Sequence, residues 1–350
     1  MEYRTLGRTG LRVSTLTFGT MTFAGSGPFR DVGATDVDGA RRQIDMCLDA
    51  GINSIDTADV YSGGQSEEIL GEVIAGRRDQ VVLATKARFP MGEGPNDAGL
   101  SRYHLVKACE ASLKRLKTDH IDLYWLHEWD GQVAVEEMLR AIEDLVRAGK
   151  IGTFGVSNFS GWHLMKMIGA SERLGLPRPC AQQIHYTLQA RDAENELIPI
   201  AIDADVPLVV WSPLAGGLLS GKYRRNQPQP DGTRHAGQWN EPPVHDEEKL
   251  YDIVDALVEV ANGLGATPAQ VALAWLLGRQ SVATLIIGAR TEEQLKDNLA
   301  AADLKLPDEA RAKLDKASQM PLQYPYWHQA KTARDRLSPA DLSLIEPFLK

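Results

Sequence analysis

Short apolar segments recur along the chain, and amphipathic segments separate them. Segments rich in β-branched or aromatic residues are predicted as strands at residues 14–19, 52–57, 81–86, 121–127, 151–157, 181–186, 207–213 and 283–289. Several lack polar–apolar alternation, which is typical of parallel strands covered on both faces. Most intervals are about 30 residues, the length of a βα unit.

The intervening segments have the period of helices, for example at residues 40–51, 101–116 and 135–150. In the first of these, Ile44, Cys47 and Leu48 share one apolar face, and Gly51 can end the helix. Strand–helix alternation fits both a doubly wound sheet and a barrel, so the number of units decides between them. Eight units favour an α/β fold of the (β/α)8 TIM barrel type.

Three segments depart from the repeat. The stretch YRTLGRTGLRVS, with Gly7 and Gly10 at turns, predicts a short N-terminal hairpin. A long loop follows the seventh strand, rich in Gly, Pro and Arg in its first half, before helical patterns resume. Residues 319–350 are predicted as a C-terminal tail packed over the rim of the barrel or on its side. Residues 1–350 would then form a single domain.

Composition narrows the possible partners. The 350 residues carry 38 Lys plus Arg and 47 Asp plus Glu, a net charge of −9, which argues against a nucleic-acid-binding surface. No apolar run reaches the roughly 18 residues of a membrane span. Cys47, Cys109 and Cys180 lie far apart without a CxxC pair, which is typical of thiols in a reducing compartment. We expect a cytoplasmic protein without nucleic-acid or membrane partners, and its oligomeric state stays open.

Polar residues lie where three consecutive strands end. Asp56 ends the second predicted strand and Tyr61 follows it, while Lys86 and His127 end the third and fourth. Strand ends meet at one rim of a barrel, so we expect these four side chains to lie together. Lys86 would lower the pKa of Tyr61, Asp56 would orient Lys86, and His127 would hydrogen-bond a carbonyl oxygen while Tyr61 donates a proton.

The same residues also fit a structural interpretation, and their spacing does not separate the two. An Asp56–Lys86 ion pair could fill a polar barrel end, with Tyr61 on a surface loop and His127 as a buried, satisfied histidine. The acid-rich stretch at 66–79 is interpreted as an exposed helix face. No spacing of His, Cys, Asp and Glu suggests a bound metal.

Further motifs follow one another along the chain, namely GINSIDTADVYSGGQSEEILG at 51–71, ATK at 84–86, LHEWD at 126–130, GVSNFS at 155–160, WSPLAGGLLSGKY at 211–223 and GARTEEQLKDNL at 288–299. With these motifs the chain resembles the aldo-keto reductase superfamily over nearly its whole length up to about residue 318. The resemblance implies a (β/α)8 barrel. It also implies a catalytic tetrad that matches Asp56, Tyr61, Lys86 and His127.

The resemblance further implies a nicotinamide dinucleotide, NADPH with NADH possible, bound without the GxGxxG motif that this sequence lacks after its first strand. Family positions that contact the cofactor correspond here to Gly19, Thr20, Met21, Asp56, Ser157, Asn158, Gln183, Trp211, Ser212, Pro213, Leu214, Gly216, Lys222, Gly288, Arg290, Gln294, Asp297 and Asn298.

By the resemblance, Ser157, Asn158 and Gln183 bind the nicotinamide carboxamide, and Trp211 stacks on the ring where many members have Tyr. From the residues alone, Ser157 and Asn158 also fit an ordinary strand-to-helix turn, and Trp211 a core position. Ser212, Leu214, Gly216 and Lys222 would follow the pyrophosphate.

The end of the cofactor that carries adenosine would meet the start of a helix. The resemblance places Arg290 and Gln294 near the ribose 2′ position, and Asp297 and Asn298 on adenine. Many members have Arg where this chain has Gln294, which weakens the inference of a 2′-phosphate site.

We therefore predict NADPH-dependent, reversible reduction of an aldehyde or ketone to an alcohol, with Tyr61 as proton donor. The main alternative is an NADPH-binding regulatory or redox-sensing subunit, as in the similar potassium-channel beta subunits. A third, a metal- or phosphate-dependent barrel lyase, would act without nicotinamide. Loops 87–100, 128–134 and 215–246 and the tail would set substrate choice. Candidate pocket residues are Trp129, Trp239, Tyr324 and Trp327, each of which equally fits packing within its loop.

Overall fold

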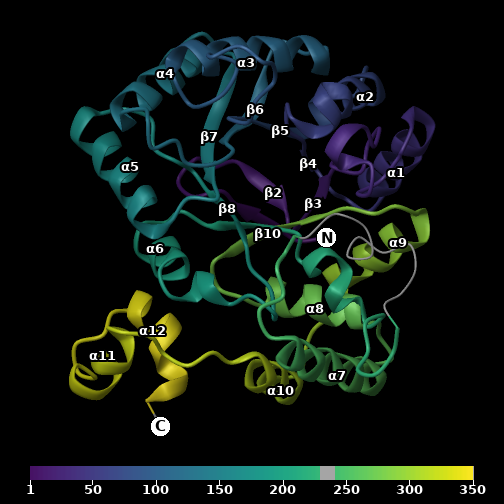
Figure 1. Cartoon of the computed structure of the whole chain (residues 1–350), viewed down its shortest axis with the longest axis vertical. Helices are drawn as coiled ribbons and strands as arrows, with labels where there is room; N and C mark the ends of the chain where they lie inside the picture. The colour runs from purple at the N-terminus through teal and green to yellow at the C-terminus, as the bar shows by residue number, and fades with distance from the viewer. Residues whose placement is uncertain (229–240, 350) are drawn as a thin grey trace.

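Parallel strands close into a barrel in the order β10-β3-β4-β5-β6-β7-β8-β9 (Figure 1). This computed structural model describes residues 1–228 and 241–349. The strands are β3 (Leu16–Gly19), β4 (Ser54–Asp56), β5 (Val82–Ala87), β6 (Ile121–Leu126), β7 (Ile151–Ser157), β8 (Gln182–His185), β9 (Leu208–Trp211) and β10 (Val282–Ile287). Each overlaps one predicted strand, so the predicted (β/α)8 barrel is confirmed.

Helices cover the outside of the barrel, namely α1 (Val37–Asp49), α2 (Gln65–Val73), α3 (Arg102–Leu116), α4 (Val135–Arg147), α5 (Gly161–Leu174), α6 (Leu197–Asp203), α7 (Glu247–Leu264), α8 (Pro268–Leu277), α9 (Glu292–Ala300) and α10 (Asp308–Ser318). Helix α4 shows why they form: Met138, Leu139 and Ile142 are buried on one face, while Glu136 and Glu137 lie in the first turn, where the helix dipole favours acids.

The N-terminal hairpin closes the end of the barrel where its strands begin. Strand β1 (Tyr3–Thr5) pairs antiparallel with β2 (Arg12–Ser14). Gly7 and Gly10 turn between them at φ values of 51° and 76°, a region that side chains disfavour. Arg4 donates a hydrogen bond to the carbonyl of Val282, the first residue of β10, at 2.6 Å. The predicted hairpin is thus confirmed.

Strand β3 joins β10 although the two are far apart in sequence. The hydroxyl groups of Thr17 and Thr284 lie 2.8 Å apart across a separation of 267 residues. Both are buried, and they form a polar contact inside the barrel wall. The seam between β3 and β10 is therefore held by side chains as well as by the strand ladder.

The connection from β9 to β10 contains η5 (Ala215–Ser220), α7 and α8. The candidate pocket residue Trp239 lies outside the described residues.

Within the described ranges, no single helix is both long and apolar enough to cross a membrane. The pair α7 and α8 meets those criteria together but is bent by 96°.

The C-terminal tail lies outside the ring of helices (Figure 1). It carries α11 (Tyr326–Thr332) and α12 (Pro339–Ile345), and α12 packs against α6. Leu344 and Ile345 are buried in a small apolar cluster there. Tyr324 and Trp327 are 75% and 50% exposed, so these two candidate pocket residues lie largely in solvent.

Candidate active site

The ends of β4, β5 and β6 bring four polar side chains together. Asp56 is the last residue of β4, Lys86 lies in β5, and His127 directly follows β6. Lys86 Nζ donates to the Asp56 carboxylate, to the carbonyl of Thr57 at 2.8 Å and to Tyr61 Oη at 3.3 Å. The ring centroids of Tyr61 and His127 are 6.0 Å apart. The geometry therefore contains the cluster expected from the strand ends.

Tyr61 begins a tight turn, η2 (Tyr61–Gly64), that a neighbouring residue holds in place. Ser62 has a φ of 50°, and its hydroxyl donates to the carbonyl of Phe23 at 3.0 Å. The same oxygen accepts from the backbone N–H of Gly25 at 3.2 Å. Ser62 thus fixes the Tyr61 turn against the loop between β3 and α1. Sequence reasoning did not identify Ser62, because its hydrogen-bond partners, Phe23 and Gly25, lie far from it along the chain.

Burial and neighbouring charges compete in setting the pKa values of the cluster. Burial raises the pKa of Tyr61, and the charge of Lys86 opposes this only in part. Lys86 therefore acts on this pKa in the expected direction, but burial outweighs it, so the pKa is raised overall and Tyr61 keeps its proton at neutral pH. Burial acts to lower the pKa of Lys86, but the Asp56 charge and hydrogen bond outweigh it and raise that pKa.

His127 is held neutral. Burial, reinforced by the charges of Lys86 and Arg88, lowers the pKa of His127 well below its usual value. A neutral imidazole carries one N–H, so it can donate a hydrogen bond to an oxygen and does not bring a second cation to the pocket.

The residues expected at the nicotinamide connect to this cluster. Gln183 Nε2 donates to Asp56 Oδ2 at 3.0 Å. Asn158 Nδ2 donates to the His127 carbonyl at 3.1 Å, and Asn158 Oδ1 accepts from Trp211 Nε1 at 3.0 Å. Ser157 lies opposite Gln183 in the β7–β8 pairing, and its buried hydroxyl has no hydrogen-bond partner among the residues described. An unpaired hydroxyl beside these amides fits a carboxamide.

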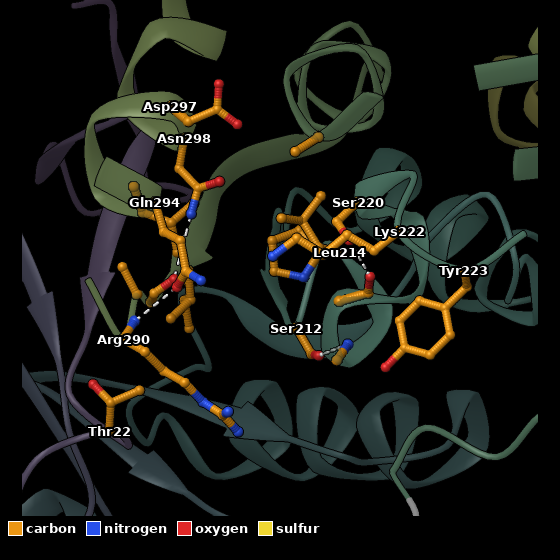
Figure 2. A pocket seen from close by; sticks show the side chains of 18 residues that line it. Thr22, Ser212, Leu214, Ser220, Lys222, Tyr223, Arg290, Gln294, Asp297 and Asn298 are labelled. Atoms are coloured by element: carbon orange, nitrogen blue, oxygen red, sulfur yellow. Dashed lines mark hydrogen bonds between the residues drawn. The ribbon is translucent and has the colours of Figure 1, made fainter. Parts of the chain in front are cut away.

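A cavity of about 270 Å³ lies beside β9, β10 and the start of α9 (Figure 2). Of the residues expected at the cofactor, those that line it are Ser212, Pro213, Leu214, Gly216, Lys222, Gly288, Arg290, Gln294, Asp297 and Asn298. Thr22, Ser220 and Tyr223 also line it and were missed by sequence reasoning. Gly19, Thr20 and Met21 do not line it, and the buried Thr20 hydroxyl lies 2.8 Å from that of Ser66.

The part of this cavity expected at the phosphates has an open backbone. Gly216 and Gly217 have φ values of 65° and 101°, and a Cβ atom on Gly217 would meet no atom within 4 Å. Ser212 Oγ accepts from the Gly216 N–H at 3.0 Å. Small residues, a hydroxyl and the nearby Lys222 ammonium are groups that suit a pyrophosphate.

At the end of the cavity expected to hold adenosine, the predicted side chains already have protein partners. Arg290 Nε donates to the carbonyl of Val32 at 3.0 Å, and its guanidinium also donates to that of Asp31. Gln294 Oε1 accepts from the Arg290 backbone N–H at 3.0 Å. Asp297 accepts from Gln270 Nε2 at 2.7 Å. Arg290 therefore links α9 to the β3–α1 loop across this end of the cavity.

Two buried acidic residues, Glu67 and Asp59, lie close in sequence to the Tyr61 turn. Glu67, in the first turn of α2, is fully buried and accepts from Thr85 Oγ1 at 2.6 Å and from Arg115 Nε at 2.6 Å. The expected exposed helix face is therefore wrong for Glu67, because α3 supplies a cation that the local sequence does not reveal. Asp59 is fully buried as well, and burial raises its pKa well above the usual value.

Trp129 packs away from the four-residue cluster. Its ring stacks on His163 at 4.1 Å and meets the edge of Phe159 at 5.2 Å. Trp129 therefore supports the start of α5.

In the ranges 1–228 and 241–349, no group of three or more His, Cys, Asp or Glu residues is placed to hold a metal ion.

Known proteins are similar in sequence to this chain over most of its length. The model of the Aldo/keto reductase family matches residues 15–319. The oxidoreductase YrpG of Bacillus subtilis (strain 168), described as uncharacterized, is 41% identical over 320 residues, which cover 88% of this chain and 93% of that protein. A probable voltage-gated potassium channel subunit beta of Arabidopsis thaliana is 36% identical over 327 residues, covering 91% and 96%.

Norsolorinic acid reductase stcV of Emericella nidulans is 36% identical over 309 residues, which cover 86% of this chain and 77% of that protein. The matched family segment contains every residue of the Asp56, Tyr61, Lys86 and His127 cluster. The chain belongs to the aldo/keto reductase family.

Proposed function

We propose that this protein reduces an aldehyde or ketone to an alcohol with NADPH, reversibly, and that Tyr61 donates the proton. The observation that carries the proposal is the 3.3 Å hydrogen bond from Lys86 Nζ to Tyr61 Oη, beside a neutral His127. A protonated phenol next to a fixed cation can release its proton and leave a stabilised phenolate.

The nicotinamide, when bound, supplies the hydride for the carbonyl carbon. Ser157, Asn158 and Gln183 would hold its carboxamide, and Trp211 would offer a flat ring for stacking. The unpaired Ser157 hydroxyl is the feature that supports this placement. These residues fix the direction from which the carbonyl must approach.

The proton step uses the side chains of the rim. The neutral His127 imidazole donates a hydrogen bond to the substrate oxygen, which orients that oxygen and polarises the carbonyl. Tyr61 Oη then transfers its proton to the same oxygen. Lys86, paired with Asp56, holds the positive charge that stabilises the phenolate until it is reprotonated.

A second candidate function is a regulatory or redox-sensing subunit that binds NADPH and turns over slowly. The relatives named as potassium channel subunits beta favour it. Its partner would be a channel protein, whereas the reductase needs only a small-molecule substrate. An intact cluster is compatible with both functions, so turnover has to separate them.

The test is a panel of aldehydes and ketones assayed by NADPH absorbance, with NADH in parallel. Rapid turnover of any panel member by the wild type supports the reductase. Tight NADPH binding with negligible turnover of the whole panel would favour the regulatory subunit. Activity that needs no nicotinamide would point to the barrel lyase instead.

The cytoplasmic location stays a prediction. What supports it is that Cys47, Cys109 and Cys180 are all buried free thiols. Burial raises the pKa of Cys180 to about 12, so this thiol stays protonated and unreactive at neutral pH.

A further inference from the structure

Arg88 brings a further positive charge to the catalytic rim. It directly follows β5, and its charge acts on His127 together with that of Lys86. Its guanidinium carbon lies 5.3 Å from the centre of the Phe89 ring. Within the described part of the chain, the buried Arg88 Nε has no hydrogen-bond partner, and the side chain makes no ion pair.

Two acids of the adjoining loops, Asp97 and Asp130, have partners other than Arg88. The backbone N–H of Gly99 donates to the Arg88 carbonyl at 2.8 Å, so this loop lies against Arg88. Asp97 in the same loop pairs with Lys107 at 2.8 Å. Asp130 accepts the backbone N–H of Leu100 at 2.8 Å. Neither carboxylate neutralises the guanidinium.

Such an arrangement is unfavourable for the protein alone. A partly buried guanidinium whose Nε–H lacks an acceptor loses hydration that no described protein group replaces. The positive charges of Lys86 and Arg88 also act on the same imidazole of His127. An anion placed between the rim and Arg88 would supply the missing acceptor and relieve this accumulation of positive charge.

Flat apolar surfaces flank the same position. Phe29 meets the Tyr61 ring edge-on with centroids 5.5 Å apart. Phe89 meets the His127 ring at 4.7 Å. A planar ring bound near these phenyl groups would bury apolar area while its carbonyl points to Tyr61 and His127.

We propose that the substrate of this protein is an aromatic aldehyde or ketone that also carries a carboxylate, and that Arg88 binds that carboxylate. The inference rests on the proposed reductase function and names its substrate class. Arg88 pairs with the acidic group through charged hydrogen bonds, while Phe29 and Phe89 contact the ring. The reacting carbonyl is left to the residues of the rim.

The test compares 3- and 4-carboxybenzaldehyde with their methyl esters, which have the same ring and aldehyde without the charge. We expect a kcat/KM for the better acid at least tenfold above that for its ester, from a lower KM at similar kcat. Arg88→Gln should raise the KM for the acid about ten- to a hundredfold and change the KM for the esters far less. Arg88→Lys should retain part of the preference.

A matched control is Arg102→Gln. Arg102 lies on α3 and pairs with Asp144 at the surface, so this variant changes the net charge equally without touching the rim. It should leave the preference for the acid intact. A wild type that reduces the esters as well as the acids overturns the proposal, and so does an equal loss for acids and esters in Arg88→Gln.

A binding measurement separates this proposal from the reductase function. Isophthalate and terephthalate carry carboxylates but no reducible carbonyl, and their dissociation constants can be measured by calorimetry on the NADP⁺-loaded protein. Arg88→Gln should weaken binding of at least one of them tenfold or more. If that happens while no carbonyl compound is reduced, the anion site holds and the reductase proposal fails. Unchanged affinities would refute the Arg88 site alone.

Discussion

The rim that carries Asp56, Tyr61, Lys86 and His127 and the end of the cavity proposed for adenosine are organised in opposite ways. At the rim, Lys86 already joins Asp56 and Tyr61 in the arrangement that proton transfer needs. At the adenosine end, Arg290 is bound to the carbonyls of Asp31 and Val32. Preorganised catalytic groups require no rearrangement when the substrate arrives. Arg290 would have to exchange or extend its contacts to bind a phosphate, and that exchange reduces the net affinity.

Loss of the rim proton donor should have the largest effect. Tyr61→Phe is expected to lower kcat about 10²- to 10⁴-fold without changing the fold, because only the hydroxyl is removed. NADPH affinity, measured by tryptophan fluorescence quenching, should stay at the wild-type value. A Phe variant that works at close to the wild-type rate would show that the proton comes from another group.

Arg290→Ala examines the opposite region. If Arg290 turns toward a 2′-phosphate, the variant should weaken NADPH binding about tenfold and leave NADH nearly unchanged, because only NADPH carries that group. If Arg290 serves only to hold the β3–α1 loop, both coenzymes should lose affinity equally. The measurement is the pair of dissociation constants for each protein.

Arg42→Ala is the matched control for this experiment. Arg42 is an exposed arginine that pairs with Glu292 at 2.6 Å, at the start of α9. Its loss changes the charge near the same helix but removes no group from the cavity. Both coenzymes should bind as they do to the wild type.

The smallest effect concerns the neutral state of His127. Its folded pKa is lowered well below 6.5, so below about pH 6.5 the unfolded chain binds a proton that the folded chain does not. Stability from this group is therefore present above pH 6.5 and falls as the pH drops toward the folded pKa, by up to about 1.4 kcal/mol per pH unit.

Thermal melts of the wild type and His127→Gln between pH 5 and pH 8 measure this contribution. The variant should lose less stability than the wild type on acidification. Parallel curves for the two proteins would mean that His127 takes up its proton in the folded state as well.

The sequence predicted the barrel from the number of strand–helix units, and the rim then follows from the barrel. Parallel strands in a closed barrel point the same way, so residues that end successive strands must meet. Asp56, Lys86 and His127 satisfy that rule without knowledge of any helix. The N-terminal hairpin was equally accessible, because Gly7 and Gly10 mark its turn locally.

Features that depend on distant packing were not predictable in this way. Glu67 has the local pattern of an exposed acid, and only the approach of Arg115 from α3 explains its burial. The contacts of Arg290 with the β3–α1 loop depend on a loop conformation that no periodicity encodes. The sequence also did not reveal that burial outweighs the effect of Lys86 on the Tyr61 pKa, since the degree of burial depends on packing around the whole rim.

The pairing of β3 with β10 also determines when the barrel can close relative to synthesis of the chain. The contact between Thr17 and Thr284 spans 267 residues, so the barrel cannot close until nearly the whole sequence has been synthesised. At a ribosomal rate of about 5–20 residues per second, β10 is synthesised roughly 15 to 50 seconds after β3. Until then the edge of β3 that pairs with β10 has no partner strand. During that interval it exposes unpaired backbone groups in an apolar strand, the kind of edge that promotes aggregation.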